Sequence, residues 1–472
     1  MTAQQHVLGQ QHGPERQQHG PAAGRSGGRH RLEVDPERQK RVEKALVAQA
    51  ETVQDGLACQ EELWSKGFTR RRMLQGVGMA GVAALASQLV TTRVAYAAAG
   101  SVTPPNTVIT IFLRGGADGL RMLVPQAPAL GNAYLRSLRP TLVQADADIR
   151  TLVGAGGWGV NKGFDPLLPF WSSGELAFVP AVSAAGVTRS HFQAQQTLER
   201  GGPSSTSGWL DRTLSALGPG TTFRALAEGT VTPASMAGNQ QKIAMDSLSA
   251  FDFPGWDGVK ALSMTAISAL YRGMSIPLAS DVQTTLSAIS TAQAAAATAG
   301  VKNGAVYPEG NFASSLADLA TLLRAEVGVE VATVDVGGWD THTEEAADID
   351  ALTASAAKAL AAFMTDLGPT RRKRVTVVVM TEFGRRVNAN ASNGTDHGTG
   401  SMMFLLGGGL AKSSVFGAWK PLSATALVDG DVAPLNSAYD VLGEVIQKRL
   451  GIGSLSTIFP GHQPAPLGLA KT

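Results

Sequence analysis

Two segments of the chain place a carboxylate and an imidazole close together, a combination that binds transition metals. Asp340 and His342 are two residues apart in VDVGGWDTH, and Asp396 directly precedes His397 in GTDHGTG. Residues two apart in an extended segment point to the same side, so Asp340 and His342 can both reach one ion. This oxygen and nitrogen set suits Zn²⁺ or Mn²⁺, with Mg²⁺ or Ca²⁺ as alternatives.

Two further carboxylates follow apolar runs. Asp118 comes after NTVITIFLRGGA, and Glu382 comes after RVTVVVMT. The alternatives are a turn aspartate that bonds its own backbone and a glutamate paired with Arg385 or Arg386. Asp396 has its own alternative, which is to orient His397 rather than bind the ion. We predict a site for one or two divalent ions, with these ligands: Asp118, Asp340, His342, Glu382, Asp396 and His397.

A hydroxyl and a histidine stand where a helix is expected to begin, in GVTRSHFQAQQTLERG. Ser190 at this position can cap the helix, or it can attack a phosphate or sulfate ester held at the helix N-terminus. Thr188 is the alternative nucleophile. Arg189 could clamp the anion, and His191 could serve as a ligand or a hydrogen-bond donor.

The polar segments are separated by elements that alternate in type. Five apolar runs predict buried strands, and amphipathic segments such as 351–368 and 437–451 predict helices between or after them. This alternation predicts an α/β fold with a mostly parallel sheet, in which ligands bind beyond the carboxyl ends of the strands. The runs cover residues 106–120, 174–186, 330–340, 374–386 and 401–410.

The middle of the chain reads differently. Residues 215–310 are rich in Ala, Ser and Thr, with helical spacing and without strand-like runs. We therefore expect a helical insertion that covers the site, the alternative being a helical layer of the main domain.

The N-terminal quarter resembles an export signal. Residues 1–68 predict a disordered or weakly helical extension, and TRRRMLQ at 69–75 resembles a twin-arginine signal. A mildly apolar run and an Ala-Tyr-Ala cleavage site at 95–97 complete a signal peptide over 69–97, and the α/β domain follows from 98 to 472. The alternative is a single membrane anchor, for which the run contains too many polar and small residues. We expect export by the twin-arginine translocase to the periplasm, the cell envelope or the medium, with no stable membrane span after cleavage.

Composition narrows the function classes. The chain has 472 residues and 44% hydrophobic residues, enough for a large core. Its net charge of +2 gives no signal for nucleic-acid binding. Its single cysteine, Cys59, precedes the predicted cleavage site, which excludes disulfides and cysteine metal sites from the mature chain.

Five segments carry a resemblance to a known family. FLRGGADGL, RSHFQAQQTLERG, GGWDTH, TEFGR and DHGTG resemble, in order, motifs of the DUF1501 family of exported bacterial proteins, over residues 105–455. The family is of unknown function and is similar to the alkaline phosphatase and sulfatase superfamily. The resemblance implies a three-layer α/β sandwich with a metal site at the strand ends. It would make Asp118 a metal ligand and Ser190 or Thr188 the nucleophile, while Phe383 stands where that superfamily usually has a histidine.

The residues and the resemblance together support two functions. The first is an exported metal-dependent hydrolase of phosphate or sulfate esters on small molecules or polymers. The second is a non-catalytic binding or cell-surface protein on the same scaffold, since a fold does not fix a function.

Overall fold

The structure is a computed structural model that describes residue 44 and residues 105–184, 188–202, 205–255, 257–274 and 276–472. The predicted signal peptide, Cys59 and all of the N-terminal extension except Lys44 lie outside the described residues. Within the described ranges, no helix combines the length and the apolar character needed to cross a membrane.

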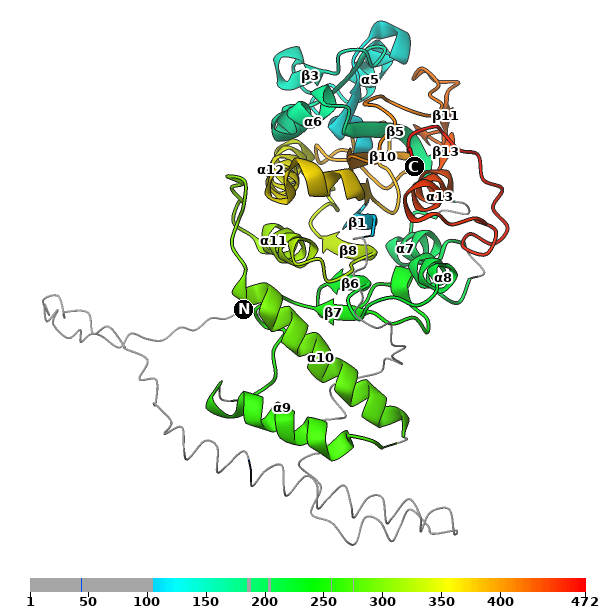
Figure 1. Cartoon of the computed structure of the whole chain (residues 1–472). Helices are drawn as coiled ribbons and strands as arrows, with labels where there is room; N and C mark the ends of the chain where they lie inside the picture. The colour runs from blue at the N-terminus through cyan, green and yellow to red at the C-terminus, as the bar shows by residue number, and fades with distance from the viewer. Residues whose placement is uncertain (1–43, 45–104, 185–187, 203–204, 256, 275) are drawn as a thin grey trace, which may run out of the picture.

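An eight-stranded sheet forms the centre of the domain (Figure 1). β10 runs antiparallel to both of its neighbours, β5 and β9, whereas the other neighbouring strands pair in parallel. The predicted α/β fold with a mostly parallel sheet is therefore confirmed. In order across the sheet, the strands are β13 (Asn436–Ser437), β5 (Leu176–Ser183), β10 (Ser401–Gly407), β9 (Val375–Met380), β1 (Thr107–Leu113), β8 (Val331–Val336), β6 (Ala225–Glu228) and β7 (Ile243–Met245).

The central strands are apolar on both faces because each face is covered. In β1, Ile109 and Ile111 belong to one hydrophobic cluster, and the alternate residues Val108 and Phe112 belong to the other. Successive side chains of a strand point to opposite faces, so a strand buried on both sides must be continuously apolar. This is why the strand runs stand out in the sequence.

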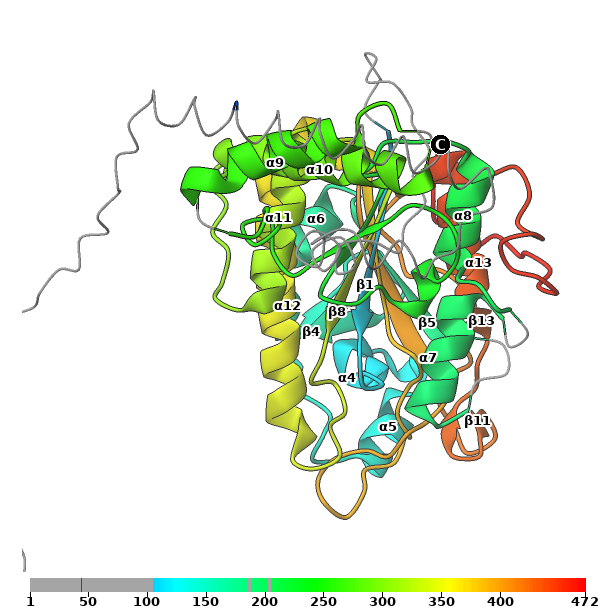
Figure 2. The same ribbon diagram turned by 90° about the horizontal axis from the view of Figure 1, so that it is seen from below.

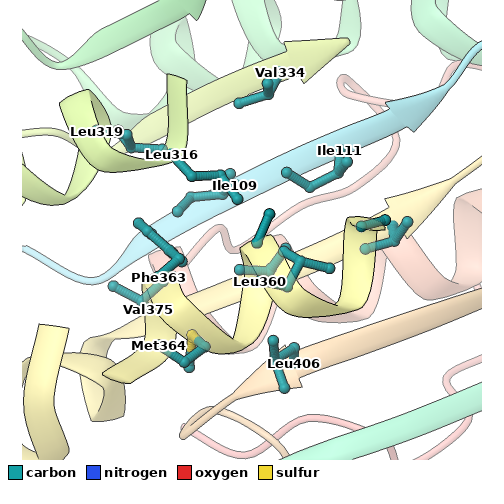
Figure 3. Close-up of a cluster of buried hydrophobic side chains, with 14 of the residues drawn as sticks. Ile109, Ile111, Leu316, Leu319, Val334, Leu360, Phe363, Met364, Val375 and Leu406 are labelled. Atoms are coloured by element: carbon teal, nitrogen blue, oxygen red, sulfur yellow. The ribbon is translucent and has the colours of Figure 1, made fainter. Parts of the chain in front are cut away.

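Helices cover both faces and complete three layers (Figure 2). On one face lie α11 (Asn311–Arg324) and α12 (Glu345–Arg371), and on the other lie α7 (His191–Arg200), α8 (Trp209–Leu217) and α13 (Ala438–Leu450). Figure 3 shows the first face, where leucines of α11 and side chains of α12 pack on β1.

Smaller elements extend the edges of the domain. A three-stranded sheet has the order β2 (Leu123–Pro125), β4 (Trp158–Asn161) and β3 (Ile149–Thr151), and β11 (Leu427–Val428) pairs with β12 (Asp431–Val432). These short strands have no strong signal in the sequence. The remaining α-helices are α4 (Gly119–Met122), α5 (Asn132–Leu138), α6 (Leu168–Ser172), α9 (Asp257–Tyr271) and α10 (Pro277–Ala297).

The expected helical insertion at 215–310 needs correction in two respects. β6 and β7 lie within it and join the main sheet, although ALAE and IAM are too short to give a periodic signal. The helices that remain, α9 and α10, cross the end of the sheet away from α4, which directly follows β1 (Figure 2). They therefore lie toward the amino ends of the strands and do not cover the carboxyl ends.

Candidate metal centre

The loops that carry the predicted site residues meet at one edge of the sheet. β1, β8 and β9 pair in parallel, so the segments that follow them emerge together. β10 runs the opposite way beside β9, so the segment that precedes β10 emerges at the same edge. Because β10 is antiparallel to β9, the DHGTG loop that precedes β10 lies beside the loops that follow β1, β8 and β9.

Three histidines and one aspartate form the centre of the site. The ligand atoms of His191, Asp340 and His397 all lie within 4.8 Å of one another. Nε2 of His191 is 3.3 Å from Oδ2 of Asp340, and Nε2 of His397 is 3.1 Å from Oδ1. His342 adds a third imidazole, whose Nε2 is 2.9 Å from Oδ1 of Asp340 and 3.0 Å from Nε2 of His397.

The spacing of these atoms fits ligands around one ion better than a hydrogen-bond network. Nε2 of His342, Nε2 of His397 and Oδ1 of Asp340 form a triangle with sides of 2.9, 3.0 and 3.1 Å. An N–H bond points along one side of such a triangle, so protons cannot satisfy all three sides. Ligand atoms around a tetrahedral Zn²⁺ with bonds of about 2.0–2.1 Å would be roughly 3.3 Å apart, close to these distances.

Two of the histidines are held from behind by hydrogen-bond acceptors. Nδ1 of His191 is 2.8 Å from Oε1 of Glu382, and Nδ1 of His397 is 2.9 Å from the backbone carbonyl of Arg189. An Nδ1–H that donates to an acceptor leaves Nε2 unprotonated and free to bind an ion. Nε2 of His191 is buried without a hydrogen-bond partner among the described residues, as this arrangement requires.

Glu382 orients the site rather than entering it. Its carboxylate is buried and accepts hydrogen bonds from His191, from the Gly115 amide at 3.0 Å and from Gln195 at 2.9 Å. Oγ1 of Thr381 lies 3.0 Å from Oε2 and 2.8 Å from the Leu113 carbonyl, so its one proton can serve either acceptor. Burial by itself would raise the pKa of the Glu382 carboxyl, but the hydrogen bonds from His191 and Gln195 outweigh it and lower that pKa. The group is therefore a carboxylate at neutral pH, and it stands behind His191 where the sequence predicted a metal ligand.

Asp340 carries the negative charge of the centre. Its burial, which would raise the pKa of the Asp340 carboxyl, is outweighed by hydrogen bonds with His397 and Arg385, and this pKa falls to about 2. Nη2 of Arg385 lies 2.7 Å from Oδ1 of Asp340, and the Arg385 side chain is fully buried.

Two predicted ligands lie outside this cluster. Asp118 is buried, caps α4 by accepting from the Leu120 amide, and pairs with Arg139 at 2.5 Å. It is the turn aspartate that the sequence left open as an alternative, with an ion pair in addition. Asp396 is at the rim, with an exposed side chain whose Oδ1 is 3.8 Å from Nδ1 of His342.

The predicted catalytic residues lie beside the cluster. Ser190 is the N-cap residue of α7 in an extended conformation, and its side chain makes no capping hydrogen bond in the described part of the chain. Its backbone amide donates to Oγ1 of Thr188 at 3.0 Å. Arg189, predicted to clamp an anion, pairs instead with the buried carboxylate of Asp431 at 2.5 Å.

Two other ionisable side chains are held inside the domain. Glu344 is exposed, but Glu345, the first residue of α12, is fully buried. Burial and the neighbouring Asp118 raise the pKa of Glu345 to about 8. His462 is mostly buried, with Nε2 2.7 Å from Oδ1 of Asp440.

The sequence did not single out two residues that shape the site. Gln195 follows His191 by four positions on α7, which places both side chains on one helix face, so this spacing could have indicated it. Arg385 was considered only as a partner for Glu382. Its contacts come from three distant segments, and no local pattern shows them.

The chain is a layered α/β protein, and the histidines and the aspartate at the ends of its strands form a candidate metal centre. The family described as "Protein of unknown function (DUF1501)" matches residues 180–440, so the chain belongs to this family. The resemblance seen in the sequence is thereby confirmed. None of the curated proteins matches the chain.

Two solved structures have a weak overall likeness to the chain. One is alkaline phosphatase from the Antarctic bacterium TAB5, with 10% identity and a TM-score of 0.27, covering 65% of this chain and 93% of that chain. The other is a mutant of the same enzyme with Mg bound, with 9% identity and a TM-score of 0.25, covering 64% and 90%. Scores at this level carry no argument about the function of this chain.

Proposed function

We propose that this chain is a metal-dependent hydrolase of phosphate or sulfate esters. The observation that carries the proposal is the convergence of three imidazole Nε2 atoms on the Asp340 carboxylate, with acceptors behind His191 and His397. Ion pairs alone give no reason for three imidazoles to gather around one carboxylate, whereas shared coordination of an ion does.

The donor set favours a transition metal over Mg²⁺ or Ca²⁺. Three nitrogens and one carboxylate suit Zn²⁺ or Mn²⁺, whereas Mg²⁺ and Ca²⁺ prefer oxygen ligands. His191, Asp340, His342 and His397 would hold the ion. When bound, it would supply Lewis-acid stabilisation of the negative charge on the transferring group.

Ser190 is the nucleophile that the geometry supports best. Its hydroxyl is not used to cap α7, although it stands at the N-cap position where serine often does so. The α7 amides and helix dipole favour an anion at this end. The Arg189 carbonyl that bonds His397 belongs to the peptide group that joins Arg189 to Ser190, which ties this serine to the cluster.

Metal analysis of the full chain, purified without a chelator, tests the proposal. We expect about one equivalent of a transition metal, and less than about 0.2 equivalents would refute it. Asp340→Ala should lose the metal. Asp335→Ala is the matched control, because Asp335 lies near the end of β8, the strand that precedes Asp340, and pairs with Arg114 rather than with the cluster.

A substrate panel then separates the two functions. Aryl phosphate monoesters, phosphate diesters and sulfates should be offered to metal-loaded protein, and we expect turnover of at least one class that is lost in Asp340→Ala. Metal binding with no turnover on any class would favour the non-catalytic binding protein. Turnover that survives in Asp340→Ala would place the reaction elsewhere.

We also propose that the chain is exported by the twin-arginine translocase, on the basis of TRRRMLQ at residues 69–75. Replacing both Arg70 and Arg71 by lysine should retain the chain in the cytoplasmic fraction. Arg72→Lys, at the variable position of the signal, is the control and should be exported. Equal export of all three chains would refute the assignment.

A further inference from the structure

A single arginine occupies a cage of oxygen atoms next to the metal centre. Arg385 is 1% exposed, and its guanidinium donates to backbone carbonyls from three separate loops and to the Asp340 carboxylate. The acceptors are the carbonyls of Gly115 at 2.6 Å, Gly116 at 2.5 Å, Trp339 at 3.0 Å, Thr341 at 3.4 Å and Thr395 at 3.0 Å, and Oδ1 of Asp340 at 2.7 Å.

This cage has the chemistry of a site for a hard cation. Several carbonyl oxygens and one carboxylate are the ligands that Ca²⁺ takes in proteins. Here a guanidinium, which is permanently charged, holds the position instead. Oδ1 of Asp340 therefore contacts a fixed cation as well as the imidazoles of His342 and His397.

Other side chains near the cluster are engaged by neighbouring residues. The Phe383 ring packs against His191 and His397, with ring centroids 4.9 and 4.7 Å apart. The carboxylates of Glu382 and Asp118, which the sequence offered as metal ligands, are engaged by His191 and Arg139.

We infer that the centre takes one divalent ion per chain, and that Arg385 stands in the place of a second cation. Arg385 is a positioning residue, since it acts on the ion through Asp340 and through His342, whose ring nitrogens both lie 3.4 Å from Nη1. The inference rests on the proposed metal centre, and it departs from the one or two ions that the sequence allowed.

The test is the metal stoichiometry of the full chain, stripped with a chelator and titrated with Zn²⁺ or Cu²⁺. We expect one equivalent to bind, and the Cu²⁺ form to give the electron paramagnetic resonance spectrum of an isolated ion. Two equivalents, or a spectrum with coupling between two ions, would overturn this inference and leave the proposed function standing. No bound metal would refute the proposed function and this inference with it.

Substitutions at Arg385 test its role directly. Arg385→Lys should keep one equivalent, because the charge stays in the cage. Arg385→Ala should bind the transition metal and, at about 1 mM Ca²⁺, one additional Ca²⁺. Arg212→Ala is the matched control and should take no Ca²⁺, because Arg212 also donates to backbone carbonyls, those of Arg200, Ser207 and Ile458, but to no carboxylate.

Circular dichroism should show that each variant is folded. A folded Arg385→Ala that takes up no Ca²⁺ would refute the stand-in role. If Arg385→Ala does not fold, Arg385→Lys decides the matter, since uptake of two transition-metal ions by that variant would contradict the inference.

Discussion

Replacing Glu382 by glutamine removes the charge behind His191 while keeping the shape of the side chain. The amide oxygen can take the place of Oε1, which accepts from His191, Gln195 and the Gly115 amide. The amide nitrogen can then donate to Oγ1 of Thr381, whose own proton can go to the Leu113 carbonyl at 2.8 Å. Each hydrogen-bonding atom keeps a partner, so the change isolates the charge.

The size of the effect follows from the hydrogen bond that is weakened. A hydrogen bond to a charged group contributes about 1.5–3 kcal/mol, and one between neutral groups about 0.5–1.5 kcal/mol. The difference of about 1–1.5 kcal/mol corresponds to roughly a tenfold loss of metal affinity, at the lower end of the 10- to 100-fold expected for groups that orient metal ligands. We expect Glu382→Gln to fold, to bind about one equivalent and to bind it about tenfold more weakly.

Competition with a chromophoric chelator at constant pH measures this loss. The control is Gln195→Met, which removes the other side-chain donor to Oε1 without changing the charge and should weaken binding by less than about threefold. The reasoning fails if Glu382→Gln binds as tightly as the parent chain. It also fails if Gln195→Met weakens binding as much as Glu382→Gln does.

Three further predictions concern Asp118, Ser190 and Glu228. Asp118→Asn leaves the buried Arg139 without its carboxylate, and it should lower the free energy of unfolding by about 3–5 kcal/mol in urea titrations. The folded fraction should keep its metal. Loss of the metal would show that Asp118 is a ligand. Ser190→Ala should lose turnover by about 100-fold or more and keep its metal, and unchanged turnover would exclude this hydroxyl as the nucleophile. Burial, together with the nearby Asp318 and Asp246, raises the pKa of the Glu228 carboxyl from 4.5 to about 9. Protonated Glu228 therefore stabilises the folded state, and this stabilisation is lost as the pH rises from 4.5 to about 9. The neutral side chain of Glu228→Gln does not lose this stabilisation. The folding equilibrium constant of Glu228→Gln should therefore rise relative to that of the parent chain by about tenfold per pH unit between about pH 5 and about pH 9. A ratio of the two constants that does not change with pH would contradict this.

Much of the fold could be read from the sequence, because its signals are local. The run before Arg114 is buried on both faces in the structure, and so are the runs that become β9 and β10. The helix predicted at 437–451 is Ala438–Leu450 in the structure. Elements of four residues or fewer, such as β6 and β7, could not be predicted, since their place in the sheet depends on pairing with β8 and not on their own composition.

The sequence alone placed polar residues at the ends of apolar strands and so determined which residues could meet at one edge of the sheet. Only the tertiary structure decided their partners: imidazoles for Asp340, His191 for Glu382 and Arg139 for Asp118. A carboxylate after a buried strand has the same local pattern whether it binds a metal, a histidine or an arginine. What it contacts depends on the register of strands and loops that are tens to hundreds of residues apart in the chain, as the 267 positions between Gly115 and Glu382 illustrate.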